Sequence, residues 1–259
     1  MLKSMLARFH ENRFLFSELV KRDFKKKYKR TYLGMVWSLL SPLLTLLVMR
    51  VVFTHFFGRS VEHYTIYLFC GNIVFSFFSD ATSTGMSSLM DNAGIFSKIN
   101  VPKYLFLFSK NVSSLINFSL TFCVFLIFCA VDGIPLSPTF LLLIYPIICL
   151  IIFNLGVGLI LSALFVFFRD IQYLWGVFTH LLMYMSAIFY TVDEFPAIAQ
   201  RLFLLNPVYV YIKYFRLAVL ESTVPSVQYH LLALGYALLA FLIGAVIYKT
   251  KNHKFLYYV

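Results

Sequence analysis

Six apolar runs, each about as long as a lipid bilayer is thick, constrain this 259-residue chain more than any other feature. They cover residues 35–57, 64–79, 104–131, 139–168, 171–192 and 231–248. The bilayer core is about 30 Å thick and needs roughly 20 helical residues to cross it, because backbone polar groups must find partners within the helix. We expect the second helix to continue past Asp80 and residues 139–168 to form one long helix. The sequence therefore predicts an all-α integral membrane protein with six transmembrane helices.

Composition supports the same class. Hydrophobic residues make up 61% of the chain and charged residues 13%. In soluble domains about 45–50% of the residues are apolar and about 25% are charged. An ordinary soluble enzyme is therefore excluded. Several spans use most of the 259 residues, so we expect no separate catalytic domain of the usual size.

The distribution of Lys and Arg predicts which side each end lies on. Residues 1–33 contain ten basic and three acidic side chains and no apolar core of a signal peptide. Six spans put both termini on one side, and 17 of the 22 basic residues then fall on that side. By the positive-inside rule both termini are cytoplasmic. We interpret the net charge of +11 as membrane sidedness rather than nucleic-acid binding.

The N-terminal segment, residues 1–33, is predicted to be a cytoplasmic amphipathic helix at the membrane interface. Its apolar face is formed by Phe16, Leu19, Val20, Phe24 and Tyr28, which recur at helical spacing with Lys and Arg opposite. The alternative is a basic stretch that only anchors topology. Residues 34–259 form the six-span transmembrane domain.

An apolar outer segment, about residues 193–221, is interrupted at Asn206-Pro207. Because proline disfavours helix continuation before it, we expect two short helices that re-enter the outer leaflet. A plain extracellular loop is the alternative, but it would leave many large apolar side chains in water.

The inner loop, about residues 91–103, reads DNAGIFSKINVPK and is expected to hold a short cytoplasmic helix. Asp91 and Asn92 are candidate helix caps, and Pro102 ends the segment. Such a helix fits a groove on a partner protein, although a tight structural loop would need the same residues. The candidate partner-coupling residues here are Asp91, Asn92, Ile95, Phe96, Lys98, Ile99 and Lys103.

The sequence lacks the motifs of several classes of function. The chain has no phosphate-binding loop of the G-x-x-x-x-G-K-[ST] type, and its six histidines are not at metal-ligand spacing. Asp80 is the sole candidate for an intramembrane carboxylate, which argues against ion-driven transport. Energy for uphill transport must then come from a partner.

Polar residues crowd the first half of the third span. Lys110 is expected to extend its ammonium group to the lipid headgroups. The others are Ser109, Asn111, Ser113, Ser114, Asn117 and Ser119. They indicate either hydrogen bonding between helices or a polar translocation surface.

Four motifs in this order resemble one family. The first, within Leu19–Leu44, is a basic helix followed by a Leu-Gly-x-x-Trp turn and a proline in the first span, and the second, Asn72–Lys103, is the second span with the coupling loop. The third is Phe-Arg-Asp within FFRDI (Phe167–Ile171), and the fourth is Leu-Asn-Pro at Leu205–Pro207. Together they resemble the permease subunits of ATP-driven, ABC-2 type exporters of bacterial surface polysaccharides, which have the type V exporter-like fold. The loop has Val101-Pro102 where many relatives have Phe-Pro.

The resemblance implies a non-catalytic, multi-pass subunit of the bacterial plasma (inner) membrane. It implies a homodimer with separate ABC ATPase subunits, which bind ATP and Mg, so this chain needs no cofactor of its own. It also implies a lipid-linked polysaccharide substrate, such as O-antigen, capsule, rhamnan or teichoic acid. The coupling loop and the N-terminal helix, with Phe24 and Tyr28, would contact the ATPase.

In that family the first and fifth spans line the transport path. Aromatic rings could stack on sugars there without gripping them tightly, or they could face lipid or pack between helices. The candidates are Trp37, Phe53, Tyr173, Trp175, Phe178, Tyr184 and Tyr190. Arg169, Asp170, Asn206 and Pro207 match family motifs and have either gating or structural roles.

Two other functions are alternatives to polysaccharide export. A permease of the same architecture could carry a drug or a small lipid. A membrane-embedded enzyme acting on lipid-linked sugars would need clustered acids or histidines at one membrane face, and the sequence does not supply them.

Overall fold

The computed structural model describes residues 12–28, 34–57, 62–135, 137–193, 195–252 and 254–258, and over these ranges the chain is helical and contains no strand. The elements are α2 (Arg13–Tyr28), η1 (Gly34–Val36), α3 (Trp37–Phe57), α4 (Tyr64–Asp91), α5 (Ala93–Phe96), α6 (Tyr104–Val131), η2 (Pro138–Leu143), α7 (Ile144–Phe167), α8 (Ile171–Met185), α9 (Ala197–Phe203), α10 (Pro207–Val219), α11 (Val227–Lys251) and η3 (Lys254–Tyr257). The predicted all-α class is confirmed.

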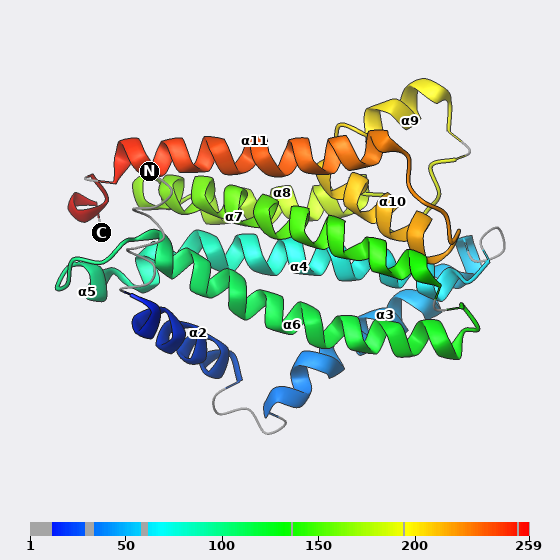
Figure 1. Cartoon of the computed structure of the whole chain (residues 1–259), viewed down its shortest axis with the longest axis horizontal. Helices are drawn as coiled ribbons and strands as arrows, with labels where there is room; N and C mark the ends of the chain where they lie inside the picture. Colours follow the sequence, from blue (N-terminus) through cyan, green and yellow to red (C-terminus); the bar gives the residue numbers. More distant parts are fainter. Residues whose placement is uncertain are drawn as a thin grey trace.

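The long helices α4, α6, α7 and α11 run lengthwise through the molecule (Figure 1). Helices α2 and α5 and the C-terminal turn lie at one end, which we call the coupling end. Helices α9 and α10 lie at the other, which we call the hairpin end (Figure 1). Segments that the charge pattern assigns to one side of the membrane are therefore gathered at one end of the bundle.

Helix α4 is the centre of the core. It packs against α6 and α7 and is also contacted by α3, α8 and α10. Phe69 of α4 is fully buried against the edge of Phe125 of α6, with ring centroids 5.3 Å apart. Phe78 stacks on Phe153 of α7 at 5.8 Å. Aromatic pairs at these distances add to the packing of large buried rings, so α4 is held on several faces at once.

Helices α7 and α11 approach each other closely. A side chain added at Gly156 of α7 would lie 2.4 Å from backbone atoms of Ala240 and Phe241. One at Gly244 of α11 would lie 2.7 Å from the carbonyl oxygen of Gly156. Small residues allow membrane helices to approach to backbone contact, so these two glycines set the spacing of the pair.

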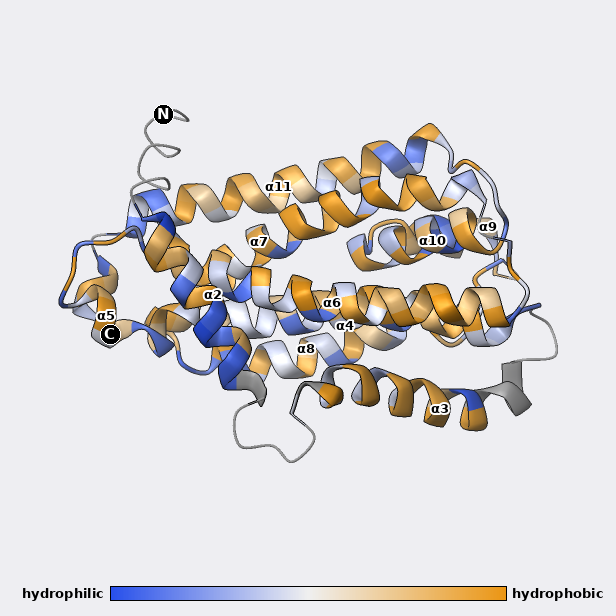
Figure 2. Cartoon of the chain, turned by 60° about the horizontal axis from the view of Figure 1, so that its bottom comes forward, coloured by the Kyte–Doolittle hydropathy of each residue, from blue (hydrophilic) through white to orange (hydrophobic). Residues whose placement is uncertain are grey.

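Among the residues that the structure describes, three helices are long and apolar enough to cross a membrane by length and composition: α6, η2 with α7 (Pro138–Phe167), and α11. The α9–α10 pair passes only as a unit and is bent by 104° at its break. Hydrophobic residues cover the bundle helices, and hydrophilic residues gather on α2 (Figure 2). As predicted, α4 continues past Asp80, ending at Asp91.

The predicted fifth span, residues 171–192, is a continuous α-helix only in its first part. Helix α8 ends at Met185 rather than near residue 192, so it has 15 residues and is about 22 Å long. The chain turns at Ala187, whose φ is 50°. Side chains of the hairpin end bind the carbonyl groups exposed at this turn, since Asn206 donates to Met185 and Arg216 donates to Ala187.

Candidate functional site

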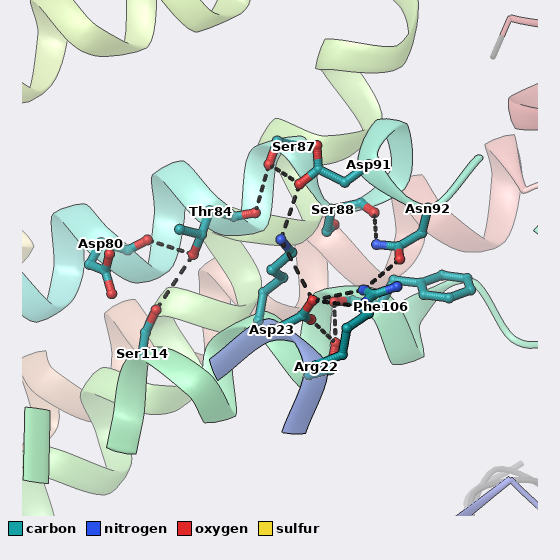
Figure 3. A network of polar contacts seen from close by, with 12 residues as sticks. Arg22, Asp23, Asp80, Thr84, Ser87, Ser88, Asp91, Asn92, Phe106 and Ser114 are labelled. Atoms are coloured by element: carbon teal, nitrogen blue, oxygen red, sulfur yellow. Dashed lines mark hydrogen bonds and ion pairs between the residues drawn. The ribbon is translucent and has the colours of Figure 1, made fainter. Parts of the chain in front are cut away.

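A polar network at the coupling end joins α2 to the bundle, with Asp23 at its centre (Figure 3). Asp23 is 6% exposed. Its Oδ1 accepts from Arg22 Nη2 at 2.7 Å, and its Oδ2 accepts from Ser109 Oγ of α6 at 3.0 Å. Lys110 Nζ lies 3.9 Å from Asp23 Oδ1. A buried carboxylate is stable only when cations and donors surround it, and this one has both.

Arg22 extends the network to the junction of α4 and α5. Its Nη2 donates to Asn92 Oδ1 at 2.7 Å, while Asn92 Nδ2 donates to the carbonyl oxygen of Ser88 at 2.7 Å. Of the two predicted caps, Asp91 is the last residue of α4, and Asn92 alone directly precedes the short helix α5. Asn92 occupies the N-cap position, but its side chain makes no cap bond, because Arg22 and Ser88 already use both ends of the amide.

Lys110 connects α6 to the last turn of α4. Its Nζ donates to Asp91 Oδ2 at 3.1 Å, and Ser87 Oγ donates to the same oxygen at 2.9 Å. The Lys110 side chain is only 14% exposed. It does not extend to the lipid headgroups as predicted, because two carboxylates, those of Asp23 and Asp91, lie closer within the protein.

The network links α2, the α4–α5 junction and α6 through charge-assisted bonds, which are stronger than neutral ones. A displacement of any one of these elements would have to stretch bonds to the other two. The geometry therefore suits transmission of movement from this end into the bundle.

The loop after α5 has an inward and an outward side. Phe96 is buried against Phe106, with centroids 6.0 Å apart. Lys103 lies 5.6 Å above the Phe96 ring, and its Nζ donates to the Asn252 carbonyl at 2.6 Å. Burial lowers the pKa of Lys103 below its usual value.

The outward side carries Lys98 and Ile99, which is 48% exposed. Ile95 and, on α2, Phe24 are half-buried, and the Tyr28 side chain lies outside the described residues. Among the predicted partner-coupling residues, Lys98 and Ile99 therefore have exposed side chains at the coupling end. Phe96, Asn92 and Lys103 instead hold the loop in place.

The predicted aromatic lining falls on α3, on α8 and on the turn that follows α8. Trp37 begins α3, and Tyr173, Phe178 and Tyr184 of α8 are between 49% and 69% exposed. Trp175 is packed between Phe78 and Phe178.

Tyr190 lies beyond the end of α8, and its hydroxyl donates to the Tyr184 carbonyl. The Phe53 side chain lies outside the described residues. Arg169 and Asp170 are exposed at the turn from α7 to α8, where the Asp170 carbonyl accepts from Tyr173 N and Leu174 N.

Asn206 and Pro207 organise the hairpin end. Pro207 is the first residue of α10, and Asn206 Oδ1 caps that helix by accepting from Val208 N and Tyr209 N at 3.0 and 3.4 Å. Asn206 Nδ2 donates to the Met185 carbonyl at 3.1 Å. One side chain therefore fixes the start of α10 against the end of α8.

Replacing Asn206 by alanine is expected to lower the thermal stability of the purified protein, because loss of a cap and a second bond costs about 1–3 kcal/mol. Asn206→Asp retains the accepting oxygen and should lose less stability. The temperature at which half of the protein leaves its monodisperse chromatographic peak measures both. An unchanged midpoint for Asn206→Ala would contradict this role.

Sequence reasoning missed Arg22, Asp23 and Arg216 as contacts. Arg216 is 3% exposed, and its guanidinium lies 3.4 Å from the centroid of the Tyr67 ring. A signal existed for Asp23, the only acid in the run KRDFKKKYKR. A lone acid among cations on a partly apolar helix indicates that the carboxylate faces protein rather than anionic lipid.

The profile of the ABC-2 type transporter family matches residues 15–220. The chain is 23% identical over 255 residues to an O-antigen export system permease protein, RfbA, of Myxococcus xanthus, with 97% of each chain covered. It is 26% identical to an RfbA of Klebsiella pneumoniae over 93% of this chain and 95% of the relative. A polysialic acid transport protein, KpsM, of Escherichia coli is 22% identical over 96% and 97%.

Proposed function

The chain belongs to the ABC-2 type transporter family, and on this premise we propose that it is the transmembrane subunit of a polysaccharide exporter. Similarity to O-antigen and polysialic acid transport proteins over almost the whole of each chain is the observation that carries the substrate class. The cargo is a lipid-linked polymer of the O-antigen or capsule type. It moves from the cytoplasm across the plasma membrane.

The energy comes from a separate ABC ATPase subunit, which binds ATP and Mg. The coupling end supports an ATPase partner because Lys98 and Ile99 are exposed there. They lie next to the Asp23 network, which connects this end through α2 and α4 to the bundle. Closure of an ATPase against this surface would move α2 and α5 together. The permease itself is non-catalytic in this scheme.

Six helices, α3, α4, α6, α7, α8 and α11, cross the inner membrane, and both termini are cytoplasmic. Support comes from the basic residues of α2, Lys98 and the C-terminal lysines, which lie at the coupling end. The bent α9–α10 pair re-enters the outer leaflet. Helix α8 crosses together with the residues that follow Met185.

Two copies enclose the transport path. Helices α3 and α8 both pack on α4 and retain exposed apolar faces, including Val48 at 59%, Val51 at 66% and Tyr173 at 69%. Aromatic side chains of α8 can contact sugar rings while allowing a polymer to slide. A complex mass corresponding to two permeases and two ATPases is the expected stoichiometry.

The function is tested by deleting the gene and analysing the surface glycan. Loss of one polymer from the cell surface, with its lipid-linked form retained in the cytoplasm, is expected. Affinity purification from native membranes should recover an ABC ATPase. An unchanged glycan combined with altered drug sensitivity would instead support the drug-permease alternative.

Replacing Ile99 by aspartate is expected to abolish export without preventing membrane insertion, because a charge replaces an exposed apolar contact for the ATPase. Surface polymer and membrane-associated permease are measured together. Val224→Asp is the matched control, since Val224 is 70% exposed in the loop before α11 at the hairpin end. Wild-type export by Ile99→Asp would reject this contact.

A further inference from the structure

A cavity of about 330 Å³ lies at the hairpin end, and a groove lies within the bundle. The groove, of about 520 Å³, lies between α3, α4 and α6. We call it the inner groove. Its polar lining includes Ser41, Ser76, Asp80, Ser114 and Thr121, and the aromatic side chain of Trp37 also lines it. A hydroxyl-rich wall beside an indole is an unusual surface within membrane-spanning helices.

Polar side chains inside a membrane are costly unless they meet each other, a neighbouring helix or a polar ligand. Some of these hydroxyls also bond within their own helices, as Thr121 does by donating to the Asn117 carbonyl. A hydroxyl that donates to its own backbone still has lone pairs to accept another bond. The groove can therefore offer acceptors to the hydroxyl groups of a ligand.

A second cavity, of about 200 Å³, adjoins the groove on the side of α2. The two share Ser114, and the second is also lined by Lys26, Lys110, Asp23 and Ser113. Asp23 is already bound by Arg22 and Ser109, whereas Lys26 is exposed. The second cavity therefore has an ammonium group free to meet an anion at the coupling end.

From Lys110 to Thr121 the α6 helix rises about 16 Å. A ligand along this path would meet cations first, then hydroxyls, and Trp37 at the groove. This order matches a lipid headgroup in which a phosphate is followed by several hydroxyl groups, because ammonium groups bind phosphate as point charges and hydroxyl-lined walls bind polyols.

We propose that the inner groove and its adjoining cavity form a binding site for an anionic, hydroxyl-rich lipid headgroup. The phosphate contacts Lys26 and Lys110, and the hydroxyl groups bind Ser114, Thr121 and their neighbours. Two lipids have this chemistry: a prenyl diphosphate that carries a sugar, and phosphatidylglycerol. The site lies within one subunit, so it does not depend on the proposed path between two copies or on the identity of the polymer.

The test uses the fluorescence of Trp37 in the full-length protein. The chain has two tryptophans, so Trp175→Phe leaves Trp37 as the sole reporter. The protein is placed in phosphatidylcholine nanodiscs and titrated with farnesyl diphosphate carrying one N-acetylglucosamine, or with dioctanoyl phosphatidylglycerol. We expect a saturable change in Trp37 fluorescence with at least one of these two probes. We expect no change with dioctanoyl phosphatidylcholine, which lacks the hydroxyl groups. Response to the sugar probe alone would assign the site to cargo, and response to both would assign it to anionic lipids in general.

Matched variants show whether the groove is responsible. Ser114→Ala with Thr121→Val should raise the half-saturating concentration about tenfold, as expected for the loss of one or two hydrogen bonds. Ser119→Ala removes a hydroxyl from α6 outside the groove and should change nothing. Lys26→Gln should weaken binding, whereas Lys25→Gln, at another exposed position of α2, should not.

Ser76→Phe, which fills the groove, should prevent the saturable change. Native mass spectrometry of lipid retained by the same proteins is an independent measurement of occupancy. The proposal is overturned if neither probe gives a saturable response, or if the groove variants bind as tightly as the Ser119→Ala and Lys25→Gln controls. Because binding is measured without the ATPase, this result is separate from any failure to export polymer.

Discussion

Cells that carry Asp23→Ala are expected to lose surface polymer by at least about tenfold, although the protein still inserts into the membrane. Asp23 is 6% exposed and accepts from Arg22 and Ser109 at 2.7 and 3.0 Å. Removing one partner of a buried, hydrogen-bonded ion pair costs about 3–5 kcal/mol. That loss would release α2 from α6, so movement at the coupling end would no longer reach the bundle. Quantitative blotting of surface polymer, normalised to membrane-associated protein, measures the effect.

Two variants control for this result. Asp23→Asn keeps the volume and one accepting oxygen, so it should retain more export than Asp23→Ala. Glu18→Gln removes a different carboxylate from α2, one that is 49% exposed and pairs with Lys21. Exposed pairs contribute about 0–1 kcal/mol, so Glu18→Gln should export normally. Normal surface polymer in cells with Asp23→Ala would show that the network does not transmit movement.

Replacing Gly156 by alanine is expected to be among the most destabilising single-methyl additions in this protein. The new carbon would lie 2.4 Å from backbone atoms of Ala240 and Phe241, a distance at which α7 and α11 must separate. Overpacking of this kind costs about 1–3 kcal/mol, and backbone cannot move aside as a flexible side chain can. The expected result is a lower thermal midpoint and less protein in the membrane.

Gly235 provides the matched control on α11. No atom lies within 4 Å of a side-chain carbon built there, so Gly235→Ala should be neutral or slightly stabilising, since alanine favours helix over glycine by about 1 kcal/mol. Equal midpoints for Gly156→Ala and Gly235→Ala would show that α7 and α11 are not held by close backbone contact.

Much of the helical architecture follows from hydropathy alone. The run at residues 104–131 coincides with α6, and the break at Asn206-Pro207 separates α9 from α10. These features are local, because apolar length specifies a span and proline disrupts the turn before it. The end of α8 at Met185 is not local, since it depends on side chains of Asn206 and Arg216 that arrive from another helix.

At the coupling end, too, some features could be predicted from the sequence and others depend on the packing of the helices. Its location and its charge could be predicted from the basic residues and from the loop at residues 91–103, because sidedness depends on composition. The bonding partners could not be predicted. Asn92 has the sequence signature of a helix cap, yet its side chain binds Arg22. Lys110 has the sequence signature of a side chain that reaches the lipid headgroups, yet it binds Asp91.

The order of apolar runs and charges along this chain is therefore sufficient to predict a helical membrane protein and the end at which its basic segments gather. The transporter family that it resembles comes from four short motifs, not from hydropathy or charge. The polar network, the glycine contact of α7 with α11 and the inner groove arise only when the helices pack. Each depends on which helix faces meet, and residues as far apart as Asp23 and Ser109 come within 3.0 Å only in the assembled bundle.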